Sequence, residues 1–401
     1  MVNMRSIVWI VGIGVIGYTS FKVYHYFFDK VAPVIRLSGM EEGGWYGGDI
    51  ACVVSGEHPY KIKNVSIFID NKPLTYHFSV GKSSFEYPFI IPSKTLPNQK
   101  HTLEVRAVDS TFNRLETVQK YSFVVDNTPL QAAFVKQGGE FRVFQGKTMH
   151  VQFQTSKPLK KGVVRLFSKQ YFCFPEADDS LVYEAYVPMD CETKPNEYIF
   201  VIDCWDNVDN VVTLEGKVQV VPFPFKKGQV TIDSAKMEEE KMVSESQELL
   251  NQQLEELAQK SPQKKLWTGS FCAPTEVGRI FTEFGSIRIT KEKGMYAHKG
   301  VDIGHLPRSG VWACQSGVVI IKDRYHFSGN TVAIDHGWGI ISLYFHLDSF
   351  SESVVVGKAI KKGHPIGTVG KTGYAAGYHL HWELRINDIA VDPMEWLVPG
   401  F

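Results

Sequence analysis

Hydrophobic and polar residues alternate in short runs over roughly the middle half of the chain. Between residues 33 and 222 these runs are broken by Gly, Pro and Asn, and no long amphipathic helix separates them. Alternation with a period of two predicts strands with one buried face and one face in solvent. We therefore expect a mostly β protein, with this region built as antiparallel β-sandwiches.

The β region repeats itself once. The repeat is marked by two Asp and Asn pairs, each following an alternating strand and offset by 94 residues: Asp109 with Asn113, and Asp203 with Asn207. The pattern predicts two modules, at residues 33–127 and 128–222, which resemble bacterial immunoglobulin-like domains. A spacer role is sufficient for both modules, because no residue in either one indicates a specific ligand.

A segment rich in Glu, Gln, Lys and Leu follows at residues 234–260. Its apolar residues recur at helical spacing before a proline that would end a helix: Val243, Leu250, Leu254, Leu257 and Pro262. This spacing predicts one linker helix with a narrow apolar stripe. This spacing favours a solvated connector with one narrow packed stripe, and packing against a partner helix or over a downstream cleft stays open.

The chain begins with an apolar stretch. From residue 6 to residue 28 the only Lys, Arg, Asp or Glu is Lys22, whose ammonium could reach lipid headgroups from a helix end. About 20 apolar residues span a bilayer, so residues 1–30 are predicted as an N-terminal transmembrane helix that anchors the chain. A cleaved signal peptide and a buried helix are the alternatives.

Composition limits the classes of protein that remain. With 401 residues, 44% hydrophobic residues and a net charge of zero, the chain is a globular protein of two or three domains. A neutral chain gives no reason to expect a nucleic-acid partner. The six cysteines leave the compartment undecided, and the disulfide connectivity stays open, because three of them share the second module: Cys173, Cys191 and Cys204.

The C-terminal third carries the candidate chemistry. His298 and Asp302 flank Gly300, which favours a turn, whereas His379 and His381 lie two apart in a strand-like run and share one face. Imidazole nitrogens and carboxylate oxygens are good zinc ligands, and three protein ligands with an open fourth position form a catalytic zinc site. The ligand set consistent with this pattern is His298, Asp302 and His381, with His379 beside the metal.

A further histidine, His346, lies in another strand-like run and could reach the same cleft. The remaining histidines of this region are expected to be surface or satisfied core residues: His305, His326, His336 and His364.

Five segments of this region, in order, are similar to peptidase family M23, the lysostaphin-type or LytM-domain zinc endopeptidases. They are FCAPTEVGRIFTEFG, HKGVD, LYFHL, GKTGYAAGYHLHWE and VDPMEWL, within residues 269–397. The resemblance implies a LytM-type antiparallel β catalytic domain at residues 265–401. It also implies one zinc ion held by His298, Asp302 and His381, with His346 and His379 as catalytic histidines. Tyr378 stands where the family usually has proline.

The resemblance implies a peptidoglycan hydrolase that cleaves peptide crosslinks in the bacterial cell envelope. Its C-terminal domains would then lie on the periplasmic side of the membrane, with peptidoglycan peptide stems as partners. A non-catalytic wall-binding protein, or a regulator of other wall hydrolases, is the alternative. The crosslink that is cleaved, the assignment of the base to His346 or His379, and the oligomeric state stay open. Glycine and apolar residues recur at every third position of residues 354–366. This pattern also occurs in biotinyl carrier domains, but no acceptor lysine motif accompanies it.

Overall fold

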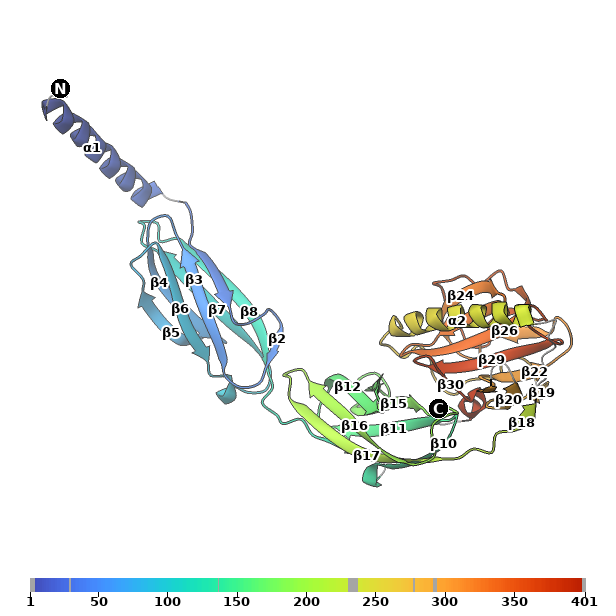
Figure 1. The fold of residues 1–401 in the computed structure, drawn as a ribbon. Helices are drawn as coiled ribbons and strands as arrows, with labels where there is room; N and C mark the ends of the chain where they lie inside the picture. The colour runs from blue at the N-terminus through green and yellow to red at the C-terminus, as the bar shows by residue number, and fades with distance from the viewer. Residues whose placement is uncertain are drawn as a thin grey trace. The chain divides into compact units, whose positions relative to one another are not determined.

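The computed structural model describes residues 4–28, 30–135, 137–229, 237–276, 278–290 and 294–398. It is mostly β, as predicted (Figure 1). The chain divides into two compact units, Met1–Pro129 with Asn207–Asn210, and Leu130–Asp206 with Val211–Phe401.

The first unit contains helix α1 (Met4–Phe28) and a β-sandwich. One sheet has the order β1-β3-β6, and the other has the order β2-β8-β7-β4-β5. The strands are β1 Val34–Ser38, β2 Gly44–Tyr46, β3 Ile50–Glu57, β4 Ile62–Ile69, β5 Lys72–Ser79, β6 Ser84–Ile91, β7 Lys100–Asp109 and β8 Glu116–Val125, with a 3-10 turn at Ser93–Thr95. Inward residues of both sheets form one core, including Val54, Ile67 and Phe123.

Over the residues that the structure describes, no helix combines the length and the apolar character needed to cross a membrane. The predicted membrane anchor at residues 1–30 is therefore not supported. In the sequence, Lys22 and the tyrosines around it interrupt the apolar run. Residues 1–3 and 29 of that segment lie outside the described residues.

The second unit begins with another two-sheet sandwich. Its sheets have the orders β10-β17-β16-β12-β13 and β14-β15-β11-β9. The strands are β9 Ala132–Phe134, β10 Glu140–Phe144, β11 Thr148–Thr155, β12 Leu159–Leu166, β13 Lys169–Phe172, β14 Phe174–Pro175, β15 Val182–Pro188, β16 Glu197–Asp206 and β17 Val211–Val221, with a 3-10 turn at Gln137–Gly139. A single core that includes Val151, Phe200 and Val218 joins the two sheets.

The pairing in both sandwiches departs from a purely antiparallel pattern at one point each. Strand β2 pairs in parallel with β8, and β10 pairs in parallel with β17. In each case the short strand lies at a sheet edge and is far in sequence from its partner, so no tight hairpin fixes its direction. The finer assignment of these modules to the immunoglobulin-like class stays a prediction.

The C-terminal part of the second unit is built on a ten-stranded sheet. Its main path has the order β19-β22-β29-β26-β25-β24-β27, with β23, β28 and β30 paired at its sides. The strands are β19 Arg279–Thr282, β22 Val301–Gly304, β23 Gly310–Trp312, β24 Gly317–Tyr325, β25 Gly329–Asp335, β26 Ile340–Phe350, β27 Ala359–Ile360, β28 Pro365–Val369, β29 His379–Ile386 and β30 Ile389–Val391. A small sheet lies beside it. Its strands pair in the order β18 (Lys227–Gln229), β20 (Ile287–Thr290) and β21 (Gly294–Ala297).

The two faces of this sheet bury different side chains. Leu380, Trp382 and Leu384 of β29 enter a large core that also contains Phe174 and Tyr186 of the preceding sandwich. The alternate residues of the neighbouring strand β26, Ile341, Leu343 and Phe345, enter a smaller core. Each face therefore has its own apolar partner, as the period of two requires.

Helix α2 (Met237–Gln259) supplies the partner for the smaller core. It lies across β24, β26 and β29 (Figure 1), and Leu250, Leu254 and Ala258 pack against the sheet. The predicted narrow stripe is therefore packed on the C-terminal sheet. Residues 234–236 of the predicted helix lie outside the described residues.

The second sandwich and the C-terminal sheet are joined by polar contacts as well as by the shared core. Lys147 Nζ lies 2.6 Å from Asp392 Oδ2, and the Thr148 backbone N–H donates to Glu395 Oε1 at 2.7 Å. Trp396 Nε1 also donates to Thr148 Oγ1 at 3.2 Å. These contacts hold the 3-10 turn Pro393–Leu397 against strand β11.

The six cysteines are free thiols in the structure. No bridge joins Cys173, Cys191 and Cys204 of the second module, whose connectivity the sequence left open. Burial raises the pKa of Cys191 to about 12, with neighbouring carboxylates adding to the effect, and raises the pKa of Cys204 to about 12. Both thiols are consequently protonated at neutral pH and behave as small apolar side chains.

The contact at Glu395 predicts a pH-dependent stability. Burial raises the pKa of Glu395 to about 7, with Asp392 adding to the effect and the Thr148 hydrogen bond and Lys147 opposing it. A raised carboxyl pKa means that the folded chain binds the proton more tightly. Stability from this group is present below about pH 4.5 and is lost as the pH rises to about 7, by at most about 1.4 kcal/mol per pH unit. Urea unfolding of the Glu395→Gln variant should show this pH slope reduced, and identical slopes in variant and wild type would contradict the assignment.

The helix α2 contact predicts a large difference between two leucines of one helix. Leu254 is fully buried, whereas Leu249 is 61% exposed. Leu254→Ala should lower the free energy of unfolding by about 2–5 kcal/mol, because it leaves a cavity against the sheet. Leu249→Ala is the matched control and should change it by less than about 0.5 kcal/mol. Equal effects in chemical denaturation would mean that α2 is not packed on the sheet as described.

Candidate metal centre

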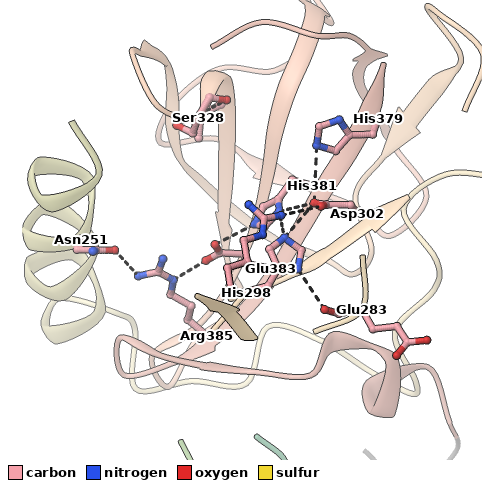
Figure 2. A network of polar contacts seen from close by, with 11 residues as sticks. Asn251, Glu283, His298, Asp302, Ser328, His379, His381, Glu383 and Arg385 are labelled. Atoms are coloured by element: carbon pink, nitrogen blue, oxygen red, sulfur yellow. Dashed lines mark hydrogen bonds and ion pairs between the residues drawn. The ribbon is translucent and has the colours of Figure 1, made fainter. Parts of the chain in front are cut away.

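Three side chains from separate parts of the C-terminal region converge on one point. His381 Nδ1 lies 2.8 Å from Asp302 Oδ1 and 3.0 Å from His298 Nε2, and His298 Nε2 lies 3.1 Å from Asp302 Oδ1 (Figure 2). Among the described residues these three form the group that could hold a metal ion. A tetrahedral zinc site with bonds of 2.0–2.1 Å has ligand atoms about 3.3 Å apart. The spacing and the donor types therefore fit a zinc ion.

Strand pairing places two of the three ligands. Asp302 on β22 lies directly opposite His381 on β29. His298 follows β21 and is fixed by its backbone N–H, which donates to the Ser286 carbonyl oxygen at 2.9 Å. Gly300 leaves room for this approach, because a Cβ there would lie 2.7 Å from His381 Nε2. The irregular turn predicted from Gly300 therefore has a steric reason.

The second nitrogen of each ligand histidine is occupied by an acceptor. His298 Nδ1 donates to the Glu283 carbonyl oxygen at 3.2 Å, and His381 Nε2 donates to Glu383 Oε1 at 3.0 Å. These bonds place the ring protons away from the convergence point. In the neutral rings, the lone pairs of His298 Nε2 and His381 Nδ1 would face the convergence point and could bind a metal, which is the arrangement found in metal-binding histidines.

The electrostatics of this cluster favour positive charge. Burial alone would lower the pKa of His381, but hydrogen bonds to Asp302 and Glu383 outweigh it and raise that pKa to about 9. Burial would raise the pKa of Asp302, yet His298 and His381 hold it far below its usual range. A buried site that stabilises one extra positive charge suits a cation.

The backbone at His346 is bent out of the regular strand. Its φ is 61°, and the pairing of β25 with β26 shifts in register between Asn330 and Val332, opposite this residue. Such an irregularity re-aims a side chain at the cost of backbone strain, which is typical of functional positions. His346 Nδ1 donates to the Thr372 carbonyl oxygen at 2.9 Å, so Nε2 keeps its lone pair.

His346 and His379 lie side by side next to the cluster. Their ring centroids are 4.8 Å apart, and His379 Nε2 lies 3.7 Å from Asp302 Oδ1. His379 Nδ1 donates to the Gly377 carbonyl oxygen at 2.9 Å. Burial, with nearby His381 and His379 adding to the effect, lowers the pKa of His346 to about 3. His346 is therefore neutral at pH 7. In both rings Nδ1 is paired with a backbone carbonyl oxygen, so Nε2 is the nitrogen left for other contacts.

The structure brings together all five residues singled out in the sequence and adds others. Glu383 Oε2 accepts from Arg385 Nε at 2.7 Å, and Arg385 Nη1 donates to Asn251 Oδ1 of α2 at 2.9 Å (Figure 2). Arg288 Nη2 lies 3.7 Å from Asp302 Oδ2. Strand alternation after His379 and His381 was a signal for Glu383 and Arg385, whereas no sequence pattern indicates Asn251 or Arg288.

The other histidines of this region lie outside the cluster, as expected. His336 is fully buried and satisfied, since Nδ1 donates to the Ser316 carbonyl oxygen and Nε2 contacts Ser342 Oγ. His326 is exposed. His364 Nε2 contacts Ser353 Oγ at 2.9 Å, and His305 Nδ1 accepts from the Leu306 backbone N–H.

The fold and site define a β-sheet domain with a His, Asp and His cluster that could hold a metal ion. Residues 296–393 match peptidase family M23, and the chain contains a LytM-type M23 domain. The resemblance in the sequence is therefore confirmed.

Curated relatives match this part of the chain. Peptidoglycan DD-endopeptidase ShyC of Vibrio cholerae is 34% identical over 122 residues, which cover 30% of this chain and 28% of ShyC. DD-carboxypeptidase/endopeptidase Mpg of Neisseria gonorrhoeae is 38% identical over 102 residues, 25% of this chain and 23% of Mpg. Murein hydrolase activator EnvC of Escherichia coli is 35% identical over 105 residues, 26% of this chain and 25% of EnvC. The chain thus spans about a quarter of the length of these relatives.

Among solved structures, a peptidase M23 structure from Pseudomonas aeruginosa is 22% identical. It aligns with 63% of this chain and 94% of its own, with a TM-score of 0.46.

The ligand set predicts different metal contents for neighbouring histidine variants. His298→Ala and His381→Ala should each lose the zinc ion, because two protein ligands remain where three are needed. His379→Ala should keep one zinc ion per chain, since its Nε2 is 3.7 Å from the carboxylate and is not part of the ligand group. His305→Ala is the control for loss of a histidine elsewhere. Metal analysis after dialysis that finds full zinc in His381→Ala would reject the ligand assignment.

Proposed function

We propose that the chain is a zinc-dependent endopeptidase that hydrolyses peptide crosslinks of peptidoglycan. The observation that carries the proposal is the convergence of His298, Asp302 and His381, with His346 and His379 beside them. The chemistry that zinc supplies in such a site is polarisation of a carbonyl group and activation of a water molecule. The relatives named as peptidoglycan DD-endopeptidases support the substrate class.

The two histidines outside the ligand set are suited to proton transfer. The Nδ1 atoms of His346 and His379 donate to backbone carbonyl oxygens, which fixes the orientation of each ring, and His379 Nε2 lies 3.7 Å from Asp302 Oδ1. A neutral His346 can accept a proton at Nε2, and either ring can hydrogen-bond a developing negative charge. His379 is the more exposed of the two, which suits a residue that meets an incoming peptide.

The proposed activity places the C-terminal domain outside the cytoplasm, because peptidoglycan lies there. Peptide stems of peptidoglycan are the proposed partners. One zinc ion per chain follows from the single ligand group among the described residues.

A regulator of other wall hydrolases is the second candidate. EnvC, which is named as a murein hydrolase activator, is 35% identical over 105 residues. A protein that acts only by binding needs no metal ligands and no proton-transfer groups. This chain has the complete ligand group and two histidines oriented by backbone acceptors, which favours the enzyme.

The proposed activity predicts chelator-sensitive release of new amino termini from purified peptidoglycan by the full chain. Added zinc should restore the release. His346→Ala should lower kcat by roughly 10²–10⁴-fold, the usual contribution of a proton-transfer residue, while the zinc content stays unchanged. His364→Ala, outside the cluster, is the control and should keep full activity. Wild-type chain that holds zinc but releases no amino termini would favour the regulator, and release that resists chelation would exclude a metal mechanism.

A further inference from the structure

Helix α2 is connected to the ligand cluster by an unbroken chain of hydrogen bonds. Asn251 Oδ1 accepts from Arg385 Nη1 at 2.9 Å, and Arg385 Nε donates to Glu383 Oε2 at 2.7 Å. The other oxygen of that carboxylate, Oε1, accepts from His381 Nε2 at 3.0 Å. Figure 2 shows these four side chains in a row between the helix and Asp302. A residue of the linker is therefore three hydrogen bonds away from a metal ligand.

The chain of contacts is buried where it passes through the sheet. His381, Glu383 and Arg385 are 6%, 3% and 3% exposed, and they share one face of β29 because they lie two apart. Both carboxylate oxygens of Glu383 are used, one by Arg385 and one by His381. Water has little access to replace any of these partners. The position of Arg385 consequently fixes the position of Glu383, and Asn251 is the contact that fixes the far end of Arg385.

The order of donors and acceptors along these hydrogen bonds suits a metal-binding histidine. His381 offers Nδ1 to the cluster only when its proton is on Nε2, where Glu383 accepts it. Its ring also stacks on Phe345, with centroids 5.1 Å apart and planes 13° apart. Phe345 belongs to the same core as Leu250 and Leu254 of α2. Helix α2 is thus connected to His381 in two ways. One is the hydrogen-bonded path, and the other is the apolar core that contains Phe345.

We propose that helix α2 is a functional part of the metal centre, with Asn251 as a positioning residue that holds His381, through Arg385 and Glu383, in its zinc-binding orientation. The proposal rests on the proposed function, since it takes His381 as a zinc ligand. In this proposal the linker helix does more than pack on the sheet, because its Asn251 also holds a metal ligand in position. Leu250 and Leu254 already seat the helix on the sheet, and an asparagine adds no apolar contact.

The helix offers a matched control for this polar contact. Gln253 Oε1 accepts from Tyr325 OH at 2.6 Å, so it also joins α2 to the sheet by one hydrogen bond. That bond ends on a tyrosine of β24, which is separated from β29 by β26 and β25 in the sheet. Loss of either bond removes one helix-to-sheet contact, whereas only the Asn251 bond leads to His381.

The test compares zinc affinity of the full chain in the Asn251→Ala, Asn251→Asp and Gln253→Ala variants by chelator competition. Asn251→Ala should weaken zinc binding about 10–100-fold, the usual cost of losing an outer partner of a ligand. Asn251→Asp keeps the acceptor oxygen and should restore the affinity, and Gln253→Ala should match wild type. Turnover of Asn251→Ala should recover at saturating zinc, because the residue does not touch the substrate.

Folding is checked on the zinc-free chains by circular dichroism and urea unfolding. Should Asn251→Ala alone fail this check, Asn251→Ser replaces it, because a serine hydroxyl is too short to reach Arg385 and is expected to weaken zinc binding in the same way. Wild-type zinc affinity in the folded Asn251 variants would overturn the inference, and so would an equal loss in Gln253→Ala. A wild-type chain that binds no zinc would instead overturn the proposed function.

Discussion

The cross-strand pairing of Asp302 with His381 is the constraint on which the site depends. It places a carboxylate and an imidazole on one face of adjacent strands, 2.8 Å apart, before any other residue contributes. A slip of one residue would turn His381 into the large core and bring Leu380 or Trp382 to the ligand face. The apolar core on the opposite face therefore protects the register of the site, since that core accepts only the alternate residues.

The same alternation explains how a helix becomes a neighbour of the ligands. On β29, one set of residues packs toward the sandwich-facing core and the other set carries His379, His381, Glu383 and Arg385. This second face also carries Leu343 and Phe345 of the adjacent strand. These side chains are apolar, so leaving them in water would be unfavourable. Helix α2 covers it, and the polar residues of β29 are buried by the same event.

Burial of so many ionisable groups is tolerated because each charge has an opposite neighbour. Arg385 balances Glu383, and the ligand histidines balance Asp302. An isolated buried charge would be strongly destabilising, and a paired one is acceptable only when its remaining hydrogen bonds are also made. The network from Asn251 to Asp302 meets that condition along its length. A cation at the convergence point would contact Asp302 directly, and it would interact with Glu383 through His381.

The sequence by itself determined the β class, the linker helix and the five histidine and aspartate residues of the cluster. These follow from spacing: periods of two and 3.6, Gly300 between two ligands, and the ordered segments that resemble the M23 family. The predicted anchor was not supported, and the narrow stripe of the linker helix packs on the C-terminal sheet. Only the tertiary structure decided the left-handed backbone at His346, the approach of Arg288, and the contact of Asn251 with Arg385, 134 residues apart. Local spacing encodes which face a side chain occupies, whereas the partner that meets that face depends on how distant elements pack.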